Sequence, residues 1–176
     1  TAEYRMSTRR FIFNYWDRAY DVNRVVVNSD GVFTRESQLF KYGKLKGFYA
    51  NANMSLMNIF DTSIGYQNMG GEIWNQKNNQ YEADEENQAF LTAVSINSSL
   101  IPKVGKVEAF YQQRNVPNPF KFNPNESTIW GYDFGVEISS SVMLIYKART
   151  NYVSNLETDG KFKAVKSLQI ETQLIF

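Results

Sequence analysis

The clearest pattern in the chain is an alternation of apolar and polar positions over its last residues. From Leu168 onward, every second residue is apolar or threonine, and the residues between them are mostly polar. A period of two is typical of a β-strand with one apolar and one polar face. The alternating set is Leu168, Ile170, Thr172, Leu174 and Phe176. The sequence therefore predicts a terminal strand with one apolar face, and its last residue is aromatic.

The same alternation recurs along most of the chain and predicts an antiparallel sheet. It is found around residues 46–56, 62–67, 90–100, 106–112, 130–138 and 142–148. A less regular run at residues 9–16 predicts a first strand. A valine-rich run at residues 25–27, followed by Asp30 and Gly31, predicts a projecting hairpin because Asp-Gly tolerates the positive φ of a tight turn. With the terminal strand, and without this hairpin, the sheet has eight expected strands.

Three short turns each predict a register that keeps the apolar positions on one face. These turns are residues 59–61, 101–104 and 139–141. The registers pair Leu56 with Ile64, Ile96 with Ala109, and Val136 with Leu144. On the opposite face of the last hairpin, Asp133 lies across from Lys147, and Gly131 lies across from Arg149.

Long polar or proline-rich connections alternate with these short turns. The long connections are residues 17–44, 70–88, 114–127 and 150–161. Short turns on one side and long loops on the other are typical of transmembrane barrels. None of the four prolines interrupts an expected strand, as ladder hydrogen bonding requires. We therefore predict one all-β domain over residues 1–176, an antiparallel up-and-down transmembrane β-barrel of about eight strands with these four segments as external loops.

The distribution of charge favours a membrane barrel over a soluble sandwich or a ligand-carrying calycin-type barrel. The apolar face of the clearer strands carries no charged residue, as lipid requires, since a midplane Arg or Lys costs about 2–4 kcal/mol there. The opposite face carries Lys106, Glu108, Asp133, Glu137, Lys147, Arg149 and Glu171. Isolated buried charges are costly, so we expect these seven residues to form a salt-bridge network inside the lumen. A polar conduit or gate is the alternative interpretation.

The terminal strand resembles the C-terminal signal strand of bacterial outer-membrane β-barrel proteins. In that class a terminal Phe follows alternating apolar residues, and the matching positions here are Leu168, Ile170, Leu174 and Phe176. The resemblance covers residues 46–176 well and indicates the class without naming a family. It implies recognition by the barrel-assembly machinery and residence in the lipid of a Gram-negative outer membrane.

The composition of the chain argues against several other classes of function. Nineteen basic and eighteen acidic residues leave a net charge of +1, which gives no field to recruit nucleic acid. No apolar run approaches the ~18 residues of a transmembrane helix. Cysteine and histidine are both absent, which removes thiolate chemistry, the commonest metal ligand and the commonest general base. We therefore expect no enzyme, no cofactor and no metal site; the acidic run at residues 82–86 lacks the spacing of a calcium loop.

The expected function is that of a structural or interaction protein that acts through its external loops. The loop with Phe120 and Phe122 could contact a protein partner or pack over the barrel mouth. Two alternatives stay open: a passive channel for small solutes, and the C-terminal strands of a larger transporter or secretion component. The second is favoured by the absence of a visible signal peptide. It also fits residues 3–9, whose Arg and Glu residues offer no obvious apolar partner for the strand at residue 46.

Overall fold

The computed structural model describes the chain except for residues 16, 21–23, 29–30, 155–161 and 175–176. The described part forms an eight-stranded antiparallel sheet and a separate two-stranded hairpin. Its strands are β1 (Ala2–Ser7), β2 (Val25–Asn28), β3 (Gly31–Thr34), β4 (Tyr42–Leu56), β5 (Phe60–Asn75), β6 (Gln80–Ile96), β7 (Val104–Val116), β8 (Ile129–Ser139), β9 (Val142–Ser154) and β10 (Phe162–Leu174). Its short 3-10 helices are η1 (Glu36–Lys41), η2 (Ser98–Leu100) and η3 (Pro119–Lys121). The prediction of an all-β antiparallel sheet is confirmed.

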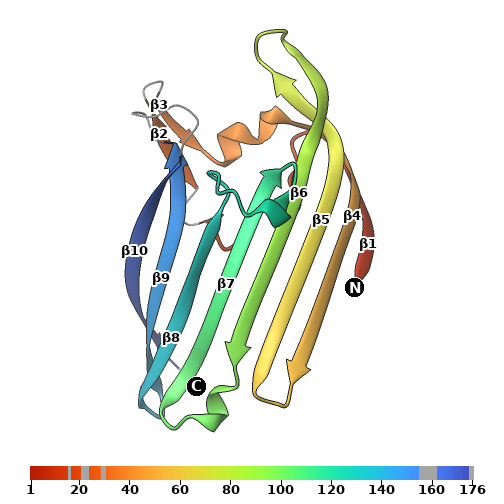
Figure 1. Ribbon diagram of the computed structural model, residues 1–176. Helices are drawn as coiled ribbons and strands as arrows, with labels where there is room; N and C mark the ends of the chain where they lie inside the picture. The colour runs from red at the N-terminus through yellow and green to blue at the C-terminus, as the bar shows by residue number, and fades with distance from the viewer. Residues whose placement is uncertain (16, 21–23, 29–30, 155–161, 175–176) are drawn as a thin grey trace.

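The strand order of the large sheet is β1-β4-β5-β6-β7-β8-β9-β10, and β2 pairs with β3. Figure 1 shows the sheet curling so that β1 and β10 become its two edges. Within the described residues no ladder joins these edges, so the sheet is open. The connections 57–59, 97–103 and 140–141 lie at one end, here called the turn end, and residues 8–41, 76–79 and 117–128 connect strands at the other, the loop end.

The predicted register of the β8–β9 hairpin is confirmed, whereas the other two predicted registers are wrong. Val136 pairs with Leu144, and Asp133 pairs with Lys147. In β4–β5, Leu56 lies opposite Phe60 instead of Ile64. The cause is the turn at Met57 and Asn58, both of which have positive φ and reverse the chain early.

The β6–β7 register differs from the prediction for a related reason. Val94, and not Ile96, lies opposite Ala109 because residues 97–103 form a longer connection that contains η2. Asn97 starts η2, and its side chain accepts a hydrogen bond from the Ser99 amide. Both corrected registers differ from the prediction by an even number of residues, so each apolar position keeps its face.

Two segments fold differently from the expectation. Most of residues 70–88, expected as a loop, continue β5 and β6 to a turn at residues 76–79. Trp74 and Tyr81 stabilise this projecting hairpin through an edge-to-face contact with ring centroids 5.0 Å apart. The strand predicted at residues 9–16 is wrong: residues 8–15 form no strand, and Arg10 and Asn14 have positive φ.

The first strand of the sheet is β1, which was not among the predicted strands. Tyr4 lies opposite Phe48 of β4, and their ring centroids are 5.1 Å apart. Met6 continues the apolar face, while Glu3 and Arg5 lie on the other. The charged residues of β1 therefore belong to its polar face and do not prevent pairing with β4.

The register separates the two faces of the sheet. The outer face carries a band of apolar side chains that are exposed although they belong to regular strands. This band comprises Tyr4, Met6, Phe48, Met54, Leu56, Phe60, Ile64, Val94, Trp130, Tyr132, Phe134, Leu168, Ile170 and Leu174. The inner face holds most of the buried side chains of the sheet, among them Met69 and Ile129. Water-soluble sheets place their apolar face inside, so this arrangement is inverted.

Residues 8–41 connect β1 to β4 and lie partly against the inner face. Ala19 is buried there in a small cluster with Phe110 and Ile129, and Ala93 packs beside it. Among the described residues, no helix combines the length and the apolar character needed to cross a bilayer.

Candidate functional site on the inner face

The centre of the inner face is a carboxylate on β8, Asp133, which is almost fully buried. Its Oδ2 accepts a hydrogen bond from Lys106 Nζ at 2.8 Å, and its Oδ1 lies 2.5 Å from Arg149 Nη2. Gly131 and Gly135 flank it on the same strand. A Cβ at Gly131 would lie 2.1 Å from the Ala148 carbonyl oxygen and 3.1 Å from Arg149 Cδ, and one at Gly135 would lie 2.8 Å from Met143 Sδ and 3.0 Å from Lys106 Cβ. The two glycines therefore leave room for the chain atoms packed around Asp133.

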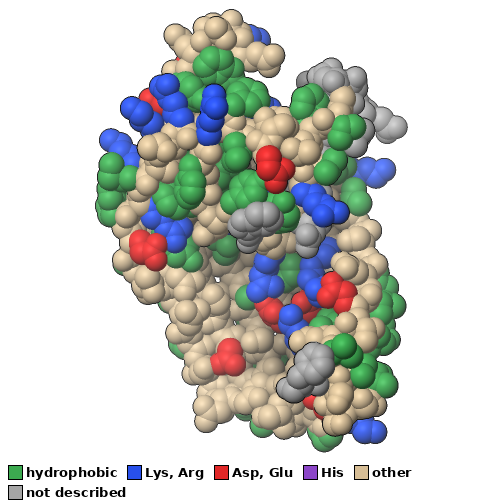
Figure 2. All heavy atoms as spheres, turned by 180° about the vertical axis from the view of Figure 1, so that it is seen from behind, with side chains coloured by type: hydrophobic (Ala, Val, Ile, Leu, Met, Phe, Trp, Pro, Cys, Tyr) green, Lys and Arg blue, Asp and Glu red, His purple; other side chains and the backbone are tan. Residues whose placement is uncertain are grey.

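A second carboxylate extends this cluster along β7. Glu108 pairs with Lys106 at 3.4 Å and with Arg18 from the connection between β1 and β4. The Arg18 and Arg149 guanidinium groups both lie over the Phe110 ring, at 4.5 and 4.7 Å from its centroid. Cation–π contact adds to the ion pairs here. Figure 2 shows acidic and basic side chains gathered in the hollow on this side of the molecule.

Six of the seven charged residues expected inside the lumen take part in ion pairs on the inner face. Their arrangement differs in detail from the expectation: Lys147 is the register partner of Asp133 but pairs with Glu171 of β10 at 2.6 Å. Lys106 takes its place, since it reaches Asp133 from the neighbouring strand. Glu137 is exposed near the turn end, and no ion pair within the described residues includes it.

A separate charged group, which the sequence pattern does not predict, holds the connection from β1 to β4 against the sheet. The side chain of Asp17 is buried and pairs with Arg114 of β7 at 2.8 Å and with Arg35 at 3.1 Å. Gln112 donates a hydrogen bond to it at 3.0 Å, and Arg114 also donates to the Asn14 carbonyl oxygen at 3.0 Å. A fully bonded carboxylate of this kind is the usual way to bury charge.

Two tyrosines of this connection bind one carboxylate of η1. The hydroxyl groups of Tyr15 and Tyr20 donate to Glu36 Oε1 at 2.7 and 3.2 Å. Desolvation and the bond to Glu36 raise the pKa of Tyr15 to about 12. The same bond lowers the pKa of Glu36 below its usual value. Both groups therefore keep the protonation states that their hydrogen bond requires around neutral pH.

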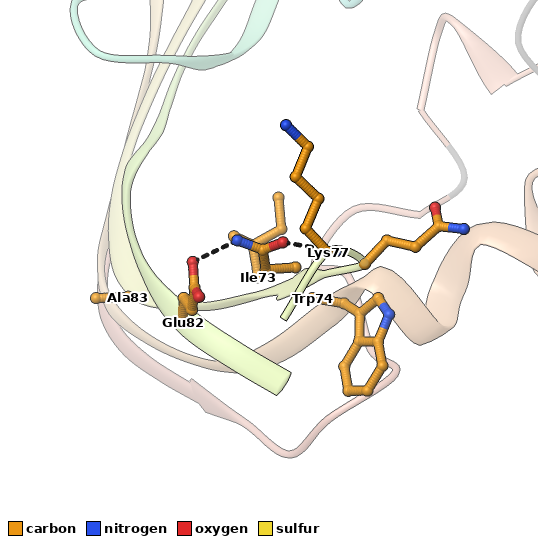
Figure 3. Close-up of a pocket in the computed structure, with 7 residues that line it drawn as sticks. Ile73, Trp74, Lys77, Glu82 and Ala83 are labelled. Atoms are coloured by element: carbon orange, nitrogen blue, oxygen red, sulfur yellow. Dashed lines mark hydrogen bonds between the residues drawn. The ribbon is translucent and has the colours of Figure 1, made fainter. Parts of the chain in front are cut away.

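The projecting β5–β6 hairpin carries a shallow groove at the loop end, drawn in Figure 3. Ile73, Trp74, Lys77, Glu82 and Ala83 are among its lining residues. Its polar groups bind one another, since the Asn75 amide donates to Glu82 at 2.7 Å and accepts from the Lys77 backbone at 2.9 Å. These contacts explain the regular hairpin in so polar a segment.

The described residues of the expected assembly signal lie on β10, which is an edge strand of the sheet. Leu168, Ile170 and Leu174 are exposed on the outer face of β10, and Phe176 lies outside the described residues. In the described part of the chain, no group of three or more acidic side chains is placed to hold a metal ion. The side chains at positions 84–86 are not among those described.

Two sets of ion pairs thus hold Asp17 and Arg18 against β7 on the inner face. Beside them lies a hollow whose lining residues include Arg18, Asn53, Asp61, Ser63, Ser95 and Glu108. No protein-family model matches the chain, and neither curated proteins nor solved structures give a match.

Proposed function

We propose that this chain is an integral β-barrel domain of a Gram-negative outer membrane, with a structural or interaction role carried by its external loops. The observation that carries the proposal is the exposed apolar band of the outer face. A monomeric water-soluble protein rarely exposes contiguous apolar patches of more than a few hundred Å². The band instead suits the acyl chains of outer-membrane lipid.

The band is also free of charge where lipid would be deepest. Outer-face positions on seven strands are uncharged over residues 48–56, 60–68, 88–96, 107–113, 130–136, 142–150 and 168–174. Lys46 and Lys166 lie on the same face, each in the half of its strand nearer the loop end. Cations near the membrane surface and none at the midplane are what a bilayer tolerates.

The segment packed against the inner face of β7 supports a structural or interaction role over a passive channel. Ala19 and the side chain of Asp17 are buried against β7, and the ion pairs of Asp133 and Glu108 occupy the neighbouring surface. A conducting pore would need a continuous wet path where these groups pack. The loop-end connections would then make the contacts with external partners. The alternation of β10 suggests the barrel-assembly machinery as a partner in biogenesis.

A larger barrel wall is the second candidate, and the open sheet favours it. β1 pairs with only six residues of β4, and the 13 residues of β10 have β9 as their one neighbour in the described sheet. Unpaired strand edges are costly in lipid because no water satisfies their backbone groups. The edges must therefore pair with each other or with further strands.

The test is refolding of the chain in detergent and in lipid vesicles, followed by electrophoresis of unheated and boiled samples. A closed barrel gives a migration shift, whereas insertion without a shift indicates a wall completed by other strands. Ile64→Arg, on the outer face, should make insertion less favourable by about 2–4 kcal/mol. Asn53→Arg, exposed on the inner side of the neighbouring strand, is the matched control and should insert normally. Equal insertion of both variants, or none by the parent chain, would overturn the membrane proposal.

A further inference from the structure

The loop between β7 and β8 lies against the outer face of the sheet and not over its loop-end opening. Phe120 stacks on Tyr66 of β5, with ring centroids 5.5 Å apart and an interplanar angle of 26°. Phe122 contacts Tyr111 of β7 edge to face at 5.6 Å, and both loop rings contact Phe90 of β6. Tyr66, Phe90 and Tyr111 belong to the outer face by register. The expectation that this loop packs over the barrel mouth is therefore wrong.

Hydrogen bonds hold this loop in one conformation. The Asn118 side chain accepts from the Phe120 amide at 2.9 Å, and Pro119 is buried. The Gln113 side chain, itself buried on the outer face, donates to the Asn123 carbonyl oxygen. Phe122 has a φ of 52° and closes η3 with its amide bonded to the Pro119 carbonyl oxygen at 3.2 Å. The positions of the two Phe rings are thus fixed by the fold.

The same loop nevertheless presents its apolar groups outward. Phe120 is 55% exposed and Phe122 is 57% exposed, and Lys121 between them is exposed as well. Phe120 stacks one ring face on Tyr66, Phe122 contacts Phe90 and Tyr111 edge to face, and more than half of each Phe stays exposed. Two aromatic rings beside a cation make up the usual composition of a segment at the membrane–water interface.

We propose that residues 118–123 are an interfacial anchor that binds the lipid leaflet on the loop side of the membrane. Phe120 and Phe122 enter the boundary between acyl chains and headgroups, and Lys121 pairs with lipid phosphate. Two observations select lipid as the occupant. The loop is continuous with the uncharged apolar band, and the cations Lys46 and Lys166 lie on the same face in the strand halves nearer the loop end. This inference rests on the proposed membrane location of the outer face.

The experiment measures the depth of single tryptophans in vesicles. The chain has three tryptophans, at positions 16, 74 and 130. All three are replaced by Phe, and Phe120→Trp is added to give the reporter protein. Two companions keep only Trp130, on the outer face, or only Trp74, on the projecting hairpin. Each protein is refolded in phosphatidylcholine vesicles with a fraction of phosphatidylglycerol and with acyl chains brominated near to or far from the headgroup.

The reporter tryptophan of the Phe120→Trp protein should be quenched at least twofold more by bromines near the headgroup than by bromines deep in the bilayer. The brominated acyl chains should quench Trp130, because it lies on the lipid-facing side of the sheet. They should leave Trp74 on the projecting hairpin unquenched. A quenched Trp130 together with an unquenched Phe120→Trp reporter would overturn the anchor and leave the membrane barrel standing; a protein partner would then be the better occupant of the loop. Unquenched Trp130 would remove both proposals. If Phe120→Trp fails to fold, Phe122→Trp serves as the reporter, with the same two outcomes.

Discussion

At the scale of single residues, Asp17 joins the connecting segment to the sheet through a buried ion pair. It lies between Arg114 of β7 and Arg35, and its side chain is only 4% exposed. Arg114 is nearly as buried, and without Asp17 its remaining described bond is to the Asn14 carbonyl oxygen. Breaking one partner of a buried ion pair costs far more than an exposed pair is worth, because the other charge stays behind unpaired.

We expect Asp17→Asn to lower the free energy of unfolding by about 3–5 kcal/mol. The substitution keeps the shape of the side chain and removes only its charge. Glu137→Gln is the control, since Glu137 is exposed and should change stability by less than about 0.5 kcal/mol. Urea titration of both variants refolded in detergent measures the difference. Equal stability of the two variants would mean that residues 14–35 do not depend on this carboxylate.

The two inner-face clusters differ in how far the sequence could predict them. Lys106, Glu108 and Asp133 follow strand alternation, so their common face could be read from the sequence. Arg114 continues that alternation along β7. Its partner Asp17 belongs to a segment without periodicity, 97 positions earlier in the chain, so no local pattern joins the two residues. Ion pairs within regular strands could therefore be predicted from the sequence, and those that fix an irregular segment could not.

At the scale of elements, the β4–β5 hairpin shows why face and register are separable. Alternation predicts which face a residue takes, and any even shift of register preserves that face. The turn decides between such registers, and here Met57 and Asn58 carry positive φ values of 54° and 55°. Asn tolerates this conformation, whereas Met gives no such signal in a sequence. The β8–β9 register was predicted because three consecutive serines mark its turn plainly.

The left-handed conformation of Met57 leads to a prediction about stability. A left-handed conformation costs a non-glycine residue about 1–2 kcal/mol. Glycine avoids this cost, but its larger unfolded-state entropy cancels part of the gain in stability. Met57 is 90% exposed, so its side chain contributes little packing. We expect Met57→Gly to raise the free energy of unfolding by about 0.5–1 kcal/mol, as measured by urea titration. Met54→Gly, in the extended part of β4, should lower it, and a loss in both variants would contradict the argument.

At the scale of the whole molecule, the open edges of the sheet decide between a closed barrel and a larger wall. β1 and β10 run in opposite directions, because seven antiparallel pairings separate the first strand from the last in the sheet order. Closure would therefore create an ordinary antiparallel ladder with an even strand number, as bacterial barrels have. The sequence could predict eight strands and their alternation; closure depends on how far the sheet curls, which no local pattern encodes.

Closure can be measured by disulfide trapping, because the chain contains no cysteine. Met6→Cys of β1 is combined in turn with Leu168→Cys, Ile170→Cys and Thr172→Cys, all on the outer face of β10. A disulfide requires Cα atoms within about 4.4–6.8 Å, so a closed barrel with one register should give an intramolecular crosslink for one combination above the others. Tyr132→Cys with Ala148→Cys, which are register partners, is the positive control. Crosslinks only between chains, with the control intact, would show that each edge pairs with another polypeptide and that this sheet is one part of a larger wall.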